Sequence, residues 1–232
     1  MKCWICKLNE ADSGEHIVKA SDLKAIFASS KAFLHTIDKK NVPIQSTKKS
    51  DLLKFKKVIC AKCNNSATQE FDYAWEEFSD YFRNNLIQFD GKKIKKAKIF
   101  PLNSRDNMKY VHLYWLKILG CYLASNYSEF DLEEIRGSLN RKKYNKKFFL
   151  CFFGRATKID RRIGALVSDL NLYNYPDKSF ALETVFVIDC LSIQLVYSDK
   201  EIPRILEGMW HPAWTRGNIT LNNGELVFGD GW

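Results

Sequence analysis

The sequence predicts an α+β protein, and three features of the chain support this fold class. Apolar residues at helical spacing recur up to about residue 141, whereas β-rich apolar runs dominate the remainder. Two C-x-x-C pairs, Cys3-x-x-Cys6 and Cys60-x-x-Cys63, lie in the first part of the chain. Helices that precede strands, instead of alternating with them, are typical of α+β folds.

The composition is sufficient for a large apolar core. Of the 232 residues, 46% are apolar, and they include 16 Phe, 10 Tyr and 6 Trp. This excludes wholesale disorder. No apolar run reaches the ~18 residues of a membrane helix, and the segment MKCWICKLNE lacks the apolar stretch of a signal peptide. We therefore expect a soluble, cytoplasmic protein with no membrane partner.

The first sixty residues predict short elements around the cysteine pairs. Residues 21–35 carry apolar residues at helical spacing, and Ser21 or Asp22 could cap a helix there. The polar segment 39–50 contains Pro43 and predicts an exposed loop. The run LLKFKKVIC (52–60) predicts a short strand that leads into the second cysteine pair.

The next part of the chain predicts three helices. Four aromatic residues between residues 64 and 86 recur at spacings of four, three and four and form one apolar stripe: Phe71, Trp75, Phe78 and Phe82. Segments 107–125 and 131–141 show the same periodicity. Between the first two helices, the basic segment 91–102 predicts an extended conformation.

The C-terminal part predicts a largely antiparallel, β-rich region. The β-rich runs, bounded by Gly, Pro, Asp or Ser, cover 146–154, 164–175, 180–188 and 191–198. Residues 202–214 predict a short helix, and 218–229 predict a hairpin around Asn222-Asn223-Gly224. We expect two regions, 1–90 and 105–232, although the apolar stripe of 71–82 could also pack on the later helices and join them into one unit.

The cysteines predict a zinc site. The chain has seven Cys, an odd number, and no export signal, which argues against a disulfide framework. Three lie singly in apolar surroundings and predict buried thiols: Cys121, Cys151 and Cys190. The four in C-x-x-C pairs supply a complete tetrahedral set of thiolates for a structural Zn²⁺: Cys3, Cys6, Cys60 and Cys63.

The positive charge is concentrated in the same segment. Residues 1–62 hold thirteen Lys against six acidic residues, whereas residues 63–232 hold 23 Lys or Arg against 21 acidic residues. A focused positive field favours polyanions, so we expect nucleic acid as the partner. The candidate contacts to the phosphate backbone are Lys19, Lys54, Lys56 and Lys57. Lysine clusters at 91–98 and 140–148 are also consistent with a chain that is simply rich in lysine.

His16 needs an explanation other than zinc binding. A closed structural site uses four ligands, and the cysteines already supply four. His16 directly follows Glu15, and Asn64 directly follows the last cysteine, so one zinc ion would draw these residues together. A carboxylate, an imidazole and an amide oxygen can bind Mg²⁺ and activate a water. The alternative is a structural histidine.

These residues resemble the motif of the HNH endonucleases, the ββα-metal nucleases, in their four-cysteine form. The resemblance rests on the two C-x-x-C pairs, on EHI at 15–17 and on CNN at 63–65, with Asp72 nine residues after Cys63, and it covers residues 1 to about 85. It implies a treble-clef-like zinc module with ββα topology, in which the zinc is remote from the chemistry.

The resemblance also implies a role for each residue of the motif. His16 would be the general base that deprotonates the attacking water. Asn64 and Glu15 would hold one catalytic Mg²⁺ or a similar divalent ion, and the products would carry a 5′-phosphate and a 3′-hydroxyl. Asn65 and Asp72 are possible accessory residues, although Asn65 could instead cap the following helix and Asp72 could lie on a solvated helical face.

Three functions follow from these observations. The first is a metal-dependent HNH-type endonuclease, with DNA as the expected substrate. The second is a zinc-stapled module that binds nucleic acid without cleaving it. The third is a scaffold in which residues 105–232, whose role the sequence does not reveal, form a homodimer or bind a partner protein.

Overall fold

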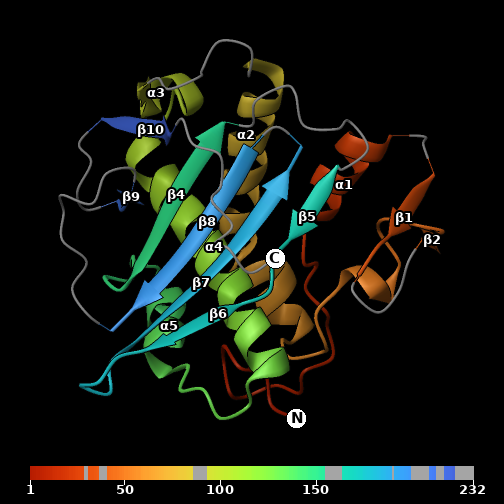
Figure 1. Cartoon of the computed structure of the whole chain (residues 1–232), viewed down its shortest axis with the longest axis vertical. Helices are drawn as coiled ribbons and strands as arrows, with labels where there is room; N and C mark the ends of the chain where they lie inside the picture. Colours follow the sequence, from red (N-terminus) through yellow and green to blue (C-terminus); the bar gives the residue numbers. More distant parts are fainter. Residues whose placement is uncertain are drawn as a thin grey trace. The chain divides into compact units, whose positions relative to one another are not determined.

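The computed structural model describes residues 1–28, 31–36, 41–85, 93–154, 164–189, 191–199, 209–212 and 217–222 (Figure 1). The fold is α+β, as predicted. Packing divides the chain into two compact units. We call residues 1–76 and 109–145 the cysteine unit, and residues 77–108 and 146–232 the sheet unit. Each unit combines two separate stretches, whereas we expected consecutive regions that meet between residues 90 and 105. The division into the regions 1–90 and 105–232 stays a prediction.

Most helices of the cysteine unit agree with the apolar periodicity, but the helix expected within 21–35 ends at Phe27, and Ala32–Leu34 form a strand instead. The N-cap of that helix is Lys19, without a side-chain cap, and not Ser21 or Asp22. The elements with residues in this unit are α1 (Ala20–Phe27), β1 (Ala32–Leu34), β2 (Val42–Ile44), a 3-10 turn (Asp51–Leu53), a π-turn (Cys63–Ala67), α2 (Gln69–Asn85), α4 (Ser104–Asn126) and α5 (Glu133–Asn140). The predicted loop 39–50 therefore contains a short strand, β2, which pairs with β1. Residues 39–40 of that loop lie outside the described part of the chain.

The two cysteine pairs are joined by antiparallel pairing between residues 13–17 and 53–59. The bridges pair Ser13 with Ile59 and His16 with Lys54. The predicted strand 52–60 is thus reduced to isolated bridges after the 3-10 turn. Gly14 is needed here, because a Cβ at this position would lie 3.0 Å from the carbonyl oxygen of Phe55. We call the paired segments 13–17 and 53–59 the two arms. In chain order, the two arms are followed by helix α2.

Helix α4 completes the core of the cysteine unit. Trp4 lies between Cys3 and Cys6 in the sequence. Its indole Nε1 donates to Cys121 Sγ of α4 at 3.4 Å. A Cβ on Gly120 would lie 2.2 Å from the Trp4 ring, so only glycine allows this approach. Trp75 of α2 stacks on Tyr114 of α4 with ring centroids 5.4 Å apart. The knuckle of the first cysteine pair is therefore packed against a helix more than a hundred residues away.

The sheet unit contains an eight-stranded sheet in the described part of the chain (Figure 1). Its strands are β3 (Lys93–Lys95), β4 (Phe148–Gly154), β5 (Ala165–Val167), β6 (Asn171–Asn174), β7 (Phe180–Ile188), β8 (Leu191–Ser198), β9 (Met209–Trp210) and β10 (Asn218–Asn222). Pairing follows the order β3-β10-β4-β8-β7-β5, with β6 on β7 and β9 on β4. The pairs are antiparallel except β10 with β4, which is parallel.

The central strands are apolar because both of their faces are covered. In β4, residues 148–152 are all buried, and Phe78 of α2 packs on Phe152 with ring centroids 5.1 Å apart. Around this core, two expectations were wrong. Segment 91–102 contains β3 and the short helix α3 (Lys96–Ile99) instead of one extended run. Of the helix expected over 202–214, residues 209–210 form β9 instead, while 202–208 and 213–214 lie outside the described residues. Residues 223–229 of the expected hairpin lie outside the described residues.

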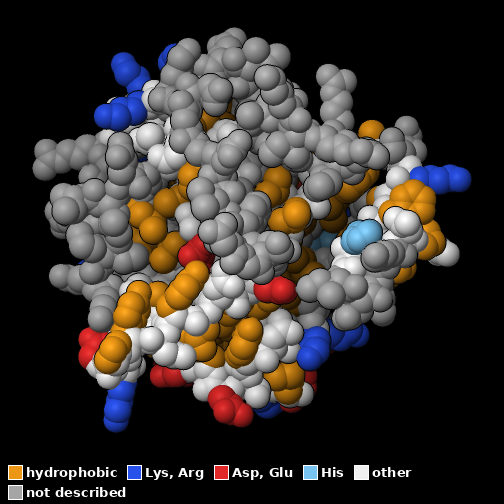
Figure 2. Space-filling model, viewed as in Figure 1, with side chains coloured by type: hydrophobic (Ala, Val, Ile, Leu, Met, Phe, Trp, Pro, Cys, Tyr) orange, Lys and Arg blue, Asp and Glu red, His pale blue; other side chains and the backbone are white. Residues whose placement is uncertain are grey.

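Some of the apolar side chains exposed in the described part of the chain lie at the edge of the sheet. Figure 2 shows hydrophobic side chains gathered at the lower left, where Figure 1 draws β6. Leu172 and Tyr173 of β6 and the following Tyr175 are exposed. None of the helices in the described ranges combines the length and the apolar character that a membrane crossing requires.

Candidate functional site

The two C-x-x-C pairs form one cluster of sulfur atoms. The Sγ atoms of Cys3, Cys6, Cys60 and Cys63 all lie within 4.8 Å of one another, and Cys6 Sγ is 3.9 Å from Cys60 Sγ. A tetrahedral Zn²⁺ with Zn–S bonds of about 2.3 Å separates its sulfurs by about 3.8 Å. The donor set and its spacing therefore fit a structural zinc ion.

Backbone and amide N–H groups surround these sulfurs. Lys7 N donates to Cys3 O at 2.9 Å, and Lys7 has a φ of 59°, in the left-handed region. Cys63 N donates to Cys60 Sγ at 3.4 Å, and Asn9 Nδ2 does so at 3.6 Å. Burial raises the pKa of Cys6, but N–H groups of Asn9 and Leu8 outweigh it and lower the value to about 6. Cys6 is therefore readily converted to the thiolate that binds metal, whereas burial raises the pKa of Cys3 and Cys63.

His16 lies on the arm that leaves the first cysteine pair, and its imidazole is oriented by the backbone. Nε2 is 3.1 Å from the carbonyl oxygen of Lys48. Because a carbonyl only accepts, Nε2 must carry the proton, and Nδ1 of the neutral ring keeps its lone pair. Burial and then the charge of Lys54 lower the pKa of His16, so the ring is neutral at pH 7. The structure thus holds an unprotonated nitrogen ready to accept a proton.

Asn64 is tied to the same arm. Its Nδ2 donates to Ser13 Oγ at 3.0 Å, and its backbone N donates to Cys60 O at 2.9 Å. The side-chain amide oxygen is then the atom left to bind a hard cation. The cysteine cluster, which fixes the backbone of Cys63, therefore brings Asn64 to the segment that carries His16.

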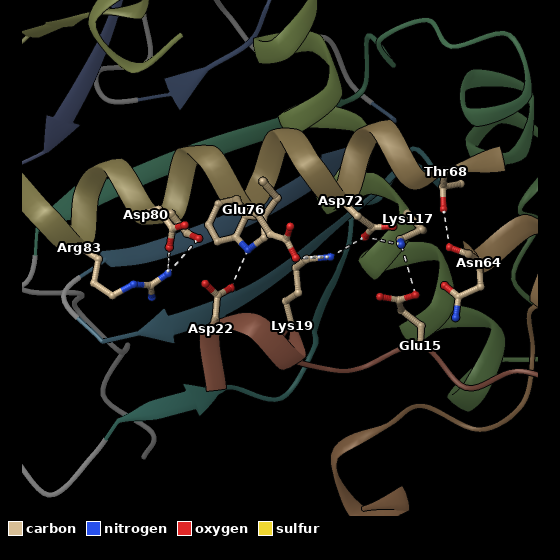
Figure 3. A network of polar contacts seen from close by, with 12 residues as sticks. Glu15, Lys19, Asp22, Asn64, Thr68, Asp72, Glu76, Asp80, Arg83 and Lys117 are labelled. Carbon is tan, nitrogen blue, oxygen red and sulfur yellow. Dashed lines mark hydrogen bonds and ion pairs between the residues drawn. The ribbon is translucent and has the colours of Figure 1, made fainter. Parts of the chain in front are cut away.

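Glu15 lies in a different environment from the one the motif implies. Its carboxylate is 6% exposed, and Oε2 is 3.2 Å from Nζ of Lys117, which projects from α4 (Figure 3). Asp72 Oδ1 is 2.9 Å from the same Nζ. Burial raises the pKa of Glu15, while the charge of Lys117 opposes that rise. Burial lowers the pKa of Lys117, but the two carboxylates outweigh it and raise the value, so the ammonium stays charged.

The predicted phosphate contacts divide into two groups. Lys19 Nζ is 3.2 Å from Asp72 and 3.5 Å from Glu76 (Figure 3), and its side chain is only 14% exposed, so it is engaged within the unit. Lys54 pairs with Asp51 at 3.3 Å. Lys56 and Lys57 are exposed, as is the possible accessory residue Asn65.

The remaining histidines and single cysteines fit structural roles. His112 and His211 are buried, whereas His35 is exposed. Cys121 and Cys151 are buried, as expected, and burial is the main cause that raises the pKa of each to about 12. Cys190 lies outside the described residues.

Three partners in this site were not identified from the sequence. Ser13, the carbonyl of Lys48 and Lys117 all contact residues of the motif. Only Lys117 left a signal, because it is a lone charge in the apolar run YWLKILG of a predicted helix. A charged side chain in such a run either reaches solvent or is buried and paired with an opposite charge.

Comparisons with protein-family models, with curated proteins and with solved structures found no match for this chain. The resemblance to HNH endonucleases therefore rests on the sequence motif alone.

Proposed function

We propose that the chain is a metal-dependent endonuclease of the HNH type, which hydrolyses phosphodiester bonds in nucleic acid, with DNA as the expected substrate. The observation that carries the proposal is His16. Its neutral imidazole is held by the Lys48 carbonyl, on the arm to which the cysteine cluster ties Asn64. A general base needs an unprotonated nitrogen, and the lowered pKa of His16 supports the proposal because it favours the neutral ring, which has one.

The proposed chemistry is a displacement at phosphorus. Nδ1 of His16 accepts a proton from water as the water oxygen bonds to phosphorus. The bond from phosphorus to the 3′-oxygen breaks, and that oxygen leaves with the electron pair and takes up a proton. A hard divalent ion such as Mg²⁺, for which the amide oxygen of Asn64 is a suitable ligand, supplies neutralisation of the phosphate charge when bound. A zinc ion on the four cysteines would be structural.

The charge distribution supports a polyanionic substrate. Lys56 and Lys57 are exposed on the arm that pairs with the His16 segment. Contacts of this kind position a phosphate backbone without reading its sequence. Lys19 is left out of this set, because its ammonium pairs with Asp72 and Glu76.

The direct test is nicking of supercoiled plasmid with and without Mg²⁺ or Mn²⁺. The parent should cut only with the divalent ion, and His16→Ala should lower the rate by at least ~100-fold, the lower range for general base catalysis. His35→Ala is the matched control, because His35 is exposed, and it should cut like the parent. Zinc content should stay equal in all three proteins. Salt-sensitive binding without turnover would instead favour the non-catalytic nucleic-acid-binding module.

A further inference from the structure

The interior of the cysteine unit contains a chain of alternating charges. It runs from Glu15 through Lys117 and Asp72 to Lys19 and Glu76, with each neighbouring pair of charged atoms 2.9 to 3.5 Å apart (Figure 3). Lys117 lies at its buried end, with a fully covered side chain. Its Nζ also lies 5.6 Å from the centre of the Tyr114 ring. Charges this deep are rare unless they are paired.

The backbone on both sides of His16 is fixed by hydrogen bonds. Phe55 N donates to Glu15 O, and Ile17 N donates to Leu53 O, both at 2.9 Å. Neighbouring side chains on an extended backbone point to opposite faces. The Glu15 carboxylate is directed inward to Lys117, and His16 is only half buried. The inward contact of Glu15 therefore sets the direction in which the imidazole points.

The same contact competes with any metal at Glu15. A divalent ion on the Glu15 carboxylate would have to share this buried group with the Lys117 ammonium at Oε2, against the repulsion between the two cations, or displace that ammonium. Asp72 could not compensate alone, because it also neutralises Lys19 at 3.2 Å. An ammonium left unpaired in the interior is strongly destabilising. The ammonium of Lys117 thus already neutralises the carboxylate that the HNH-type motif would assign to a metal ion.

We propose that Lys117 is a positioning residue that anchors Glu15, and that Glu15 orients the His16 arm instead of binding the catalytic divalent ion. The statement about His16 rests on the proposed nuclease function. The anchor itself concerns only the fold of the cysteine unit, so it can be tested separately.

The first test is a Mg²⁺ titration of plasmid nicking by Glu15→Gln and Lys117→Met. If both residues position the arm, each variant lowers the maximal rate, and the Mg²⁺ concentration at half-maximal rate stays within about twofold of the parent. If Glu15 is a metal ligand, Glu15→Gln instead raises that concentration by roughly 10–100-fold, as loss of groups that support a metal does. The second pattern would overturn the proposal.

The second test needs no activity and uses thermal unfolding of the zinc-loaded proteins. Lys117→Met should lower the melting temperature by roughly 10 °C, because two carboxylates lose their buried counter-ion. Adding Glu15→Gln to Lys117→Met should recover part of this loss. Lys147→Met is the control: its ion pair with Asp199 at 3.1 Å is partly exposed, and the expected loss is below about 2 °C.

The two tests separate the two claims. A parent protein that cuts nothing with any divalent ion would refute the nuclease function, and the thermal cycle would then decide on the anchor alone. A double variant more stable than Lys117→Met supports the anchor. Losses that simply add would overturn it, because independent residues do not couple.

Discussion

The two units of the chain bury different kinds of residue. In the sheet unit, the central strands are covered on both faces, and the core consists of aromatic and aliphatic side chains such as Phe148, Phe152 and Ile193. In the cysteine unit, the aromatic core formed by Trp75 and its neighbours lies against a buried ammonium, Lys117, and a buried carboxylate, Glu15.

Under the proposed function, this difference separates residues that stabilise the fold from residues that position the catalytic arm. An apolar core gains free energy from burial alone, whereas a buried ion pair is at best weakly stabilising compared with apolar groups of equal size. Charges placed inside a protein are therefore better explained by a task than by stability. In the cysteine unit, the charged cluster adjoins the arm that carries His16.

The largest expected effect comes from breaking the sulfur cluster. Cys60→Ala should remove the metal and unfold the cysteine unit, because structural zinc sites contribute ~10 kcal/mol or more to folding in small domains. Cys151→Ala is the matched control in the sheet unit. It removes a buried thiol that lies outside the cluster, and it should cost only about 1 kcal/mol. Zinc content and near-ultraviolet circular dichroism are measured for both variants. An unchanged spectrum for Cys60→Ala would contradict a structural role for the four-cysteine metal site.

A smaller effect is expected where α4 meets the knuckle. Gly120→Ala would place Cβ 2.2 Å from a Trp4 ring atom, and we expect a loss of about 3 kcal/mol in the free energy of unfolding, the upper range for overpacking. Gly137→Ala in α5 is the control. Its Cβ would meet only the movable guanidinium of Arg141, so the better helix propensity of alanine should stabilise it by up to about 1 kcal/mol. Urea unfolding measures the free energy of unfolding of both variants. Equal free energies for Gly120→Ala and Gly137→Ala would refute the close contact of Gly120 with Trp4.

The smallest expected effect concerns the pH dependence of cutting. The pKa of His16 is lowered, so the neutral base is present at pH 7, and activity should fall only as the pH drops through a value below 6.5, the ordinary pKa. The fold favours the neutral imidazole, so protonation of His16 favours the unfolded chain. The free energy of unfolding should therefore also decrease as the pH falls below 6.5. Lys54→Met removes one cause of the shift and should move the acidic limb to higher pH. Lys24→Met, on the exposed side of α1, should leave it in place.

Much of the fold could be predicted because it is encoded locally. The stripe from Phe71 to Phe82 and the apolar run of 107–125 predicted α2 and α4 to within a few residues at most ends. The runs 180–188 and 191–198 coincide with β7 and β8. The pairing order of the sheet was not predictable in this way. A parallel β10–β4 pair depends on residues about seventy positions apart, which local periodicity does not record.

The candidate site was predictable where spacing determines it. Each C-x-x-C pair encodes its own knuckle, and the four sulfurs lie together as expected. The environment of Glu15 was not predictable, because its partner Lys117 is 102 positions away. A motif identifies which residue types are present, whereas the sign of the charge that faces them is set by tertiary packing. The hydrogen bond from His16 to the Lys48 carbonyl could not be predicted either, because every residue carries a backbone carbonyl and the sequence does not show which one will accept.

The most direct measurement is a crystal structure of the zinc-loaded protein soaked in Mn²⁺, with the anomalous signal used to locate both metals. We predict zinc among the four cysteine sulfurs and manganese bound by the Asn64 amide oxygen, with the Glu15 carboxylate still on Lys117. Manganese bound by Glu15 with Lys117 displaced would contradict the assignment of Glu15, and no manganese near Asn64 and His16 would contradict the proposed catalytic site.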